Sequence, residues 1–123
     1  FHSISAKMLR MHAEKLGFTS DYVILDTDDQ LRLLKTILQE RNVDIKQNPP
    51  KHYLYFIQQW KDKGLTPEKL SNADALAAGG ARVTEIYHEY QRRLKQRNAM
   101  DFGDLLLHCL TLFTDYPDVL RSY

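Results

Sequence analysis

The sequence contains few of the residues that interrupt or cross-link a chain. It has one cysteine, four prolines and five glycines in 123 residues. The lone Cys109 cannot form an internal disulfide, so we expect an inert core thiol of a reducing compartment. No apolar run approaches the length of a membrane span, and no signal segment is visible. These absences predict a cytoplasmic protein with no membrane partner.

The sequence also lacks an excess of either charge, with seventeen Lys and Arg against sixteen Asp and Glu. A net charge of +1 does not indicate a broad basic surface for nucleic acid, so any DNA contact must be local or shared with other parts of a larger protein. The five histidines show no paired metal-ligand spacing. There is no G-x-x-x-x-G-K-[ST] loop and no acidic strand-end pair for Mg²⁺, so we expect no cofactor in this chain and no hydrolysis of a nucleoside triphosphate by it.

Apolar residues recur with helical periodicity along most of the sequence. This pattern predicts an all-α fold, a compact bundle of about five to seven helices forming one domain over residues 1–123. The segment 22–25 has the composition of a strand but no partner run elsewhere, so a buried linker is expected there. Residues 72–82 give the weakest pattern. Helix starts are expected near Ile4, Asp26, Tyr53, Thr66, Val83 and Asp101.

Two aromatic residues, Phe1 and Phe102, stand beside expected helix N-termini. An aromatic ring there combines a flat face for a base with backbone N–H groups for phosphates, which favours binding of single-stranded nucleic acid. Asp101 and Asp104 have the spacing of an N-cap and its N3 residue, and such a cap contributes about 0.5–2 kcal/mol. The cap accounts for both carboxylates but not for Phe102. That ring either packs in the core or stacks on a base, the latter worth roughly 1–3 kcal/mol.

Two short motifs are misleading. Asp101-Phe102-Gly103 spells the metal-binding tripeptide of protein kinases, but the other kinase motifs are absent. The segment 26–29 begins like a calcium loop and then departs from its pattern. Among the basic residues, Lys61 and Lys63 flank an expected exposed turn at Gly64 and are the better candidates for DNA contact, although a solvated face is the commoner explanation.

Five segments together resemble the UvrD/PcrA/Rep-like superfamily 1 DNA helicases, with UvrD the nearest subtype. They match in order and with fitting spacing over essentially the whole chain: Phe1-His2-Ser3 with the helix after it, Ile24 to Leu31, Lys63 to Pro67, Tyr87 to Gln91, and Met100 to Leu106. The resemblance implies the helical insertion called domain 1B. The chain is expected to be incomplete, with residues 1–16 and 101–123 adjoining a RecA-like domain that carries the ATP and Mg²⁺ site.

The same resemblance implies roles for individual residues. Phe1 matches a motif residue that contacts single-stranded DNA, and Phe102 matches an aromatic that stacks on or abuts a base. His2 and Ser3 match neighbours that touch the backbone of the DNA or hold that loop. The implied parent is an ATP-dependent 3′–5′ DNA helicase of repair and replication, whose partners are single-stranded DNA, single-strand/duplex junctions and the remaining helicase domains.

An alternative from a different class remains open at this stage. Near-zero net charge and exposed apolar ends are also typical of a non-catalytic helical module that binds another protein. A phosphate-binding loop upstream in the coding sequence and an acidic strand-end motif downstream would favour the helicase.

Overall fold

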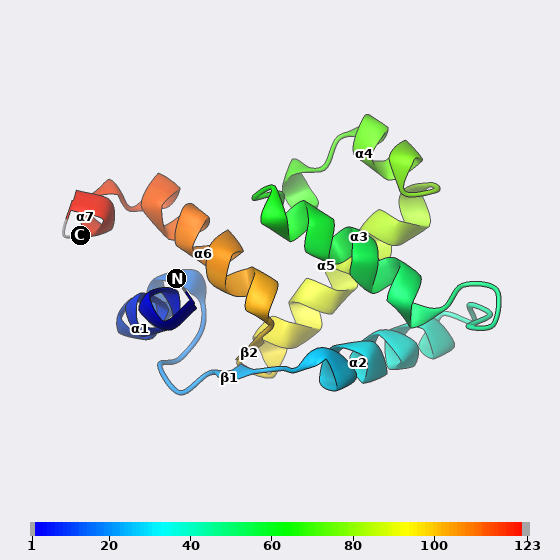
Figure 1. Ribbon diagram of the computed structural model, residues 1–123, viewed down its shortest axis with the longest axis horizontal. Coiled ribbons are helices and arrows are strands. Elements are labelled where there is room, and N and C mark those ends of the chain that lie inside the picture. Colours follow the sequence, from blue (N-terminus) through cyan, green and yellow to red (C-terminus); the bar gives the residue numbers. More distant parts are fainter. Residues whose placement is uncertain (1, 122–123) are drawn as a thin grey trace.

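The computed structural model describes residues 2–121, without the side chains of residues 2–5 and 120, and most of this chain is helical (Figure 1). The helices are α1 (His2–Met11), α2 (Thr27–Glu40), α3 (Pro50–Asp62), α4 (Asn72–Ala77), α5 (Ala81–Gln96), α6 (Phe102–Asp115) and α7 (Pro117–Arg121). Two short 3₁₀ helices, η1 (Ala13–Leu16) and η2 (Pro67–Lys69), and two strands, β1 (Val23–Ile24) and β2 (Ala99–Met100), complete the described part.

The larger hydrophobic cluster lies between α2, α3 and α5. Its centre is the stacked pair Trp60 and Tyr87, whose ring centroids are 5.5 Å apart, and Tyr90 is fully buried beside them. The apolar stripes of these helices recur at i, i+3 and i+4, so each helix presents one continuous apolar face to the others. Trp60 and the tyrosines Tyr87 and Tyr90 of α5 are therefore core residues.

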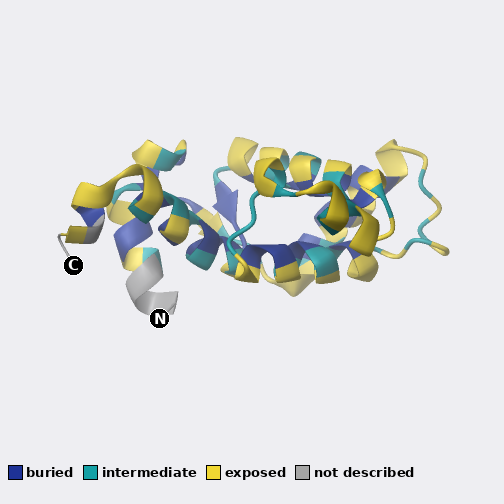
Figure 2. Ribbon diagram, turned by 90° about the horizontal axis from the view of Figure 1, so that it is seen from above, coloured by how far each residue is buried: buried dark blue, intermediate teal, exposed yellow. Residues whose placement is uncertain are grey.

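A second, smaller cluster joins α1, α6 and α7 with the segment that follows η1. Met8 and Leu9 of α1 pack with Leu105 and Leu112 of α6, and Cys109 is buried among them. Figure 1 shows this group of helices set apart from the group formed by α2–α5, with the two strands between them. The elongated outline in Figure 2 follows from this arrangement, since each group has its own buried interior.

The two strands lie between the clusters and correct two expectations. β1 pairs with β2 in parallel, with Val23 opposite Ala99 and Ile24 opposite Met100. The prediction of an all-α compact bundle is therefore wrong, as is the prediction of an unpaired linker at 22–25. The backbone N–H groups of Val23 and Leu25 donate to the carbonyls of Asn98 and Met100, which satisfies both donors. Each strand is only two residues long, too short to produce an alternating pattern in the sequence.

Most helix boundaries follow local chemistry that the sequence indicates. Asp26 accepts a hydrogen bond from the Asp29 N–H and caps α2, and Ser71 forms a capping box with Asp74 at the start of α4. This box orders part of the segment that gave the weakest pattern. Pro117 is the first residue of α7, a position that favours proline because no intrahelical N–H donor is needed there.

Candidate nucleic-acid interface

Phe102 is the first residue of α6 and stands at the junction of the two clusters. Phe102 is 52% exposed, whereas Asp101 before it is fully buried and Asp104 two positions later is 1% exposed. An apolar ring is thus presented to solvent from a backbone whose neighbouring polar groups are inside the protein. This reverses the usual distribution of polar and apolar side chains, so the turn is a candidate binding site.

The two carboxylates form a complete capping box. Asp101 Oδ1 accepts the Asp104 N–H at 2.9 Å, and Asp104 Oδ2 accepts the Asp101 N–H at 3.1 Å. The predicted cap is confirmed. The box uses one oxygen of each carboxylate and leaves the other, Asp101 Oδ2 and Asp104 Oδ1, to be satisfied from elsewhere.

Lys61 satisfies both remaining oxygens. Its Nζ lies 2.7 Å from Asp101 Oδ2 and 2.9 Å from Asp104 Oδ1, and its side chain is completely buried. The expectation that Lys61 stands exposed at the turn and meets a phosphate is wrong in this structure, because the ammonium is enclosed between two carboxylates. The exposed neighbour is Lys63, the C-cap of α3, which stays a candidate for DNA contact.

Helix α5 adds two further donors to the buried carboxylates. The Tyr90 hydroxyl donates to Asp101 Oδ2 at 2.8 Å, and the Tyr90 ring centroid lies 5.1 Å from Lys61 Nζ. Gln91 Nε2 donates to Asp104 Oδ1 at 3.0 Å. All four carboxylate oxygens therefore have at least one donor. We call Lys61, Tyr90, Gln91, Asp101 and Asp104 the buried polar cluster.

Protonation states within the cluster follow from burial and charge. Burial alone would raise the pKa of Asp104, but attraction to Lys61, with His108 and the hydrogen bonds, holds that pKa below its ordinary value. Burial, reinforced by the Asp101 carboxylate, raises the pKa of Tyr90, so its hydroxyl keeps its proton and donates. Burial lowers the pKa of His108, whose Nε2 is 3.5 Å from Asp104 Oδ1.

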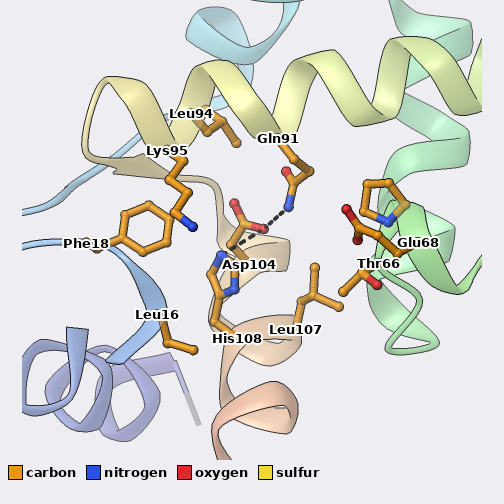
Figure 3. Close-up of a pocket in the computed structure, with 11 residues that line it drawn as sticks. Leu16, Phe18, Thr66, Glu68, Gln91, Leu94, Lys95, Asp104, Leu107 and His108 are labelled. Carbon is orange, nitrogen blue, oxygen red and sulfur yellow. Dashed lines mark hydrogen bonds and ion pairs between the residues drawn. The ribbon is translucent and has the colours of Figure 1, made fainter. Parts of the chain in front are cut away.

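Figure 3 shows the far side of the cluster, where Gln91 of α5 and His108 of α6 both point toward Asp104. A cavity of about 190 Å³ lies here, lined by polar groups and by apolar side chains that include Phe18 and Leu107. The Phe18 and His108 rings are 5.3 Å apart. Asp104 lines this cavity together with Gln91 and His108, so its carboxylate meets polar side chains there.

Gly103 allows the chain to approach Lys61 closely. A Cβ at this position would lie 3.0 Å from Lys61 Cδ and 2.8 Å from Gln58 Oε1. The stem of Lys61 thus crosses the first turn of α6 directly behind Phe102. Because the ammonium is held at its far end, the stem has little freedom to move away.

The other predicted DNA-contacting residues are only partly described. Phe1 lies outside the described residues, so its approach to Phe102 stays a prediction. His2 and Ser3 belong to α1, but their side chains are not among those described. Among the described histidine, cysteine and acidic side chains, no group of three is placed to hold a metal ion. None of the described helices is long and apolar enough to span a membrane.

Sequence reasoning missed the groove between α2 and α3. It is largely apolar, with a volume of about 490 Å³, and is lined by Leu31, Leu54 and the 58% exposed Tyr55. Gln58 lines it as well, so the groove reaches the residue that faces Gly103, next to Phe102. Tyr55 follows the buried Tyr53 and the partly buried Leu54 without a break in apolar character, which hid its exposure.

Comparison with known proteins defines the class as that of DNA helicases. The family model described as the UvrD/REP helicase N-terminal domain matches residues 1–123. The chain belongs to this family. The matching region is the N-terminal domain, the 1A region, so the expected assignment to the 1B insertion is wrong.

Relatives in several bacteria agree with the family. The chain is 41% identical to a probable DNA helicase II homologue of Rickettsia felis, 36% to the ATP-dependent DNA helicase PcrA of Bacillus subtilis, and 33% to DNA helicase II of Escherichia coli. In each case the whole chain is covered, but it spans only 16–19% of the relative's length. The chain is therefore similar to one part of these longer proteins.

Proposed function

We propose that this chain is a DNA-contacting part of an ATP-dependent 3′–5′ DNA helicase of repair and replication, and that it grips single-stranded DNA during translocation. Family membership and the names of the relatives support a DNA helicase as the whole protein. The grip itself is supported by the local geometry of α6.

The observation that carries the proposal is the exposed Phe102 ring on a buried, fully hydrogen-bonded helix start. A ring in this position can stack on a base without rearrangement of the backbone beneath it. Stacking on an aromatic side chain is worth about 1–3 kcal/mol per base and is tolerant of sequence. Such tolerance suits a protein that must move along DNA of any sequence.

The remaining domains of the helicase supply the parts that this chain does not carry. They would bind ATP and Mg²⁺, and their closure on the nucleotide would move the strand past Phe102. The adjoining single-strand/duplex junction is the second DNA partner. Lys63 would contribute a phosphate contact near the strand, with Phe1, His2 and Ser3 from the other end of the chain.

The test is the substitution Phe102→Ala in the full-length helicase. Loss of one stacking contact predicts an affinity for a short single-stranded oligonucleotide lower by about 5- to 150-fold. It also predicts ATP turnover that is no longer coupled to unwinding. Binding is measured by fluorescence anisotropy of the labelled oligonucleotide, and coupling by the ratio of base pairs opened to ATP hydrolysed.

The matched control is Tyr116→Ala. Tyr116 is a 37% exposed aromatic at the opposite end of the same helix, about 20 Å from Phe102 at 1.5 Å per residue. We expect this variant to bind DNA like the unsubstituted protein. Equal affinity and unwinding of the Phe102→Ala variant and the unsubstituted protein would remove Phe102 from the interface.

A further inference from the structure

We propose that Lys61 is a positioning residue for DNA binding: from inside the protein it fixes the first turn of α6 and so sets the direction of the Phe102 ring. This inference rests on the proposed function. In this role Lys61 does not contact a phosphate. It affects DNA binding only indirectly, by fixing the helix turn that carries the Phe102 ring.

The first argument is that capping α6 does not require Lys61. Asp101 Oδ1 already accepts the Asp104 N–H, and the reciprocal bond completes the box. A box of this kind normally stands at the surface, where water satisfies its outer oxygens. Here both carboxylates are buried with an ammonium between them, and their formal charges sum to −1. Buried charges cost more desolvation than an apolar contact of the same size, so stability alone does not account for the arrangement.

The second argument is the place of the cluster between separate elements. Lys61 comes from the C-terminal turn of α3, Tyr90 and Gln91 from the middle of α5, and the carboxylates from the start of α6. Helices α3 and α5 belong to the larger hydrophobic cluster, whereas α6 carries much of the smaller one. The ionic and hydrogen-bonded contacts therefore fix how α6 leaves β2 relative to both neighbouring helices.

The third argument is that Phe102 has no independent backbone freedom. The residue before it is held through its N–H and both carboxylate oxygens, and Asp104 is held in the same three ways. The Lys61 stem passes behind Gly103. A ring whose backbone is fixed before the strand arrives loses less entropy on binding than a ring on a mobile turn. Loosening the cluster should therefore weaken stacking even though the ring remains.

The experiment uses the full-length helicase and a labelled oligothymidylate as probe. Lys61→Met keeps most of the stem and removes the charge, and Tyr90→Phe removes only the hydroxyl that donates to Asp101. Lys63→Met removes one exposed charge two residues away, at the proposed phosphate contact, and should reduce the magnitude of the salt slope by about one, so it shows how the loss of a phosphate contact looks in this assay. Each is combined with Phe102→Ala, and affinity is measured over a range of salt concentrations. Circular dichroism and thermal unfolding check that every variant is folded.

We expect Lys61→Met to lower affinity by at least about threefold and up to the loss caused by Phe102→Ala, about 5- to 150-fold. The slope of log K against log salt should equal that of the unsubstituted protein, because no phosphate contact is lost. In the Phe102→Ala background, Lys61→Met should cause no further loss. A slope reduced in magnitude by about one would assign Lys61 to a phosphate and overturn the inference.

Additive losses from Lys61→Met and Phe102→Ala would overturn it as well, since they would mean that Lys61 acts independently of the ring. Should Lys61→Met not fold, Tyr90→Phe is used in its place. We then expect a smaller loss of DNA affinity, and no loss when Tyr90→Phe is combined with Phe102→Ala. The two proposals fail differently. Unchanged affinity of Phe102→Ala refutes the interface itself, whereas a weakened Phe102→Ala with unaffected Lys61→Met and Tyr90→Phe refutes only the positioning role.

Discussion

Removing the charge of Lys61 should destabilise the protein strongly, and the loss should depend on pH. Lys61→Met leaves two buried carboxylates without their cation, at sites where the ammonium lay 2.7 and 2.9 Å away. Breaking a buried ion pair by removal of one partner costs about 3–5 kcal/mol. Methionine fills most of the volume of the lysine stem, so the cavity contribution is small. The expected loss is a large share of a total stability of about 5–15 kcal/mol.

The sign of the pH dependence follows from Asp104. In the unsubstituted protein its pKa is held below the ordinary value of 3.8, so its contribution to stability is present above that value and is lost as pH falls through the lowered pKa. Without Lys61, burial dominates and raises the pKa of Asp104 above that of the unfolded chain. The folded variant then takes up a proton before the unfolded chain does, so the difference in stability between the two proteins should narrow as pH falls from about 7 toward 4.

Urea unfolding at a series of pH values measures this difference. Trp60 is the only tryptophan, is 4% exposed and is stacked on Tyr87, so its fluorescence reports the loss of the larger cluster. Lys63→Met provides the control, with an expected change within about 0.5 kcal/mol at an exposed site. A loss below about 1 kcal/mol for Lys61→Met, or a difference that stays constant over the pH range, would refute the account of the cluster.

Two further predictions concern residues beside the cluster. Because burial lowers the pKa of His108, the unfolded chain binds a proton at this residue at a higher pH than the folded protein does, so the free energy of unfolding should fall as pH drops below about 6.5. Urea unfolding over this pH range should show a flatter profile for His108→Gln, and an unchanged profile would contradict a lowered pKa of His108. Gly64 has φ +73° and an added Cβ would lie 3.0 Å from Leu110 Cδ1, so Gly64→Ala should cost at least about 1–2 kcal/mol in urea unfolding. Gly79→Ala, with φ +98° and open space around it, is the control, and an equal loss there would remove the Leu110 contact from the explanation.

The sequence is informative about the helices because their signals are local. Asp26 and Asp101 were predicted as caps from their positions before apolar runs, and both accept the expected N–H. The buried residues of α5 recur at helical spacing in the sequence, because an amphipathic helix of sixteen residues repeats its pattern over more than four turns. The apolar faces of the long helices can therefore be read from periodicity.

The strand pair could not be predicted in the same way, because its evidence is not local. Val23 and Ala99 are separated by most of the chain and pair through backbone atoms, which carry no sequence signal. Val23 is moreover 55% exposed, so the sequence of this segment lacks the alternation of buried and exposed apolar residues that predicts a strand. Near the strand pair, the Asn98 side chain accepts the Thr19 N–H and donates to Thr19 Oγ1, which links the segments that lead into the two strands.

The burial of Lys61, by contrast, had a signal that was not used. Tyr53, Ile57 and Lys61 are spaced by four residues and lie on one face of α3, the face that enters the core. A lysine that continues an apolar stripe needs a buried anion, and Asp101 with Asp104 was the pair already recognised as a helix start. Lys63, two positions later, falls on the opposite face. The exposed turn suggested one environment for both lysines, whereas helical geometry separates them.

Charged groups link α3 to the start of α6, where the two hydrophobic clusters meet. An apolar contact between α3 and the start of α6 would be non-directional and would tolerate rotation of the first turn. Four carboxylate oxygens with assigned donors from α3, α5 and the α6 backbone tolerate far less, because each rotation would strand a buried polar atom. The exposed Phe102 ring belongs to the first turn of α6, which lies where the two hydrophobic clusters meet. The direction of the ring therefore depends on contacts from α3 and α5, and we expect substitutions inside the buried polar cluster to alter the proposed grip on DNA.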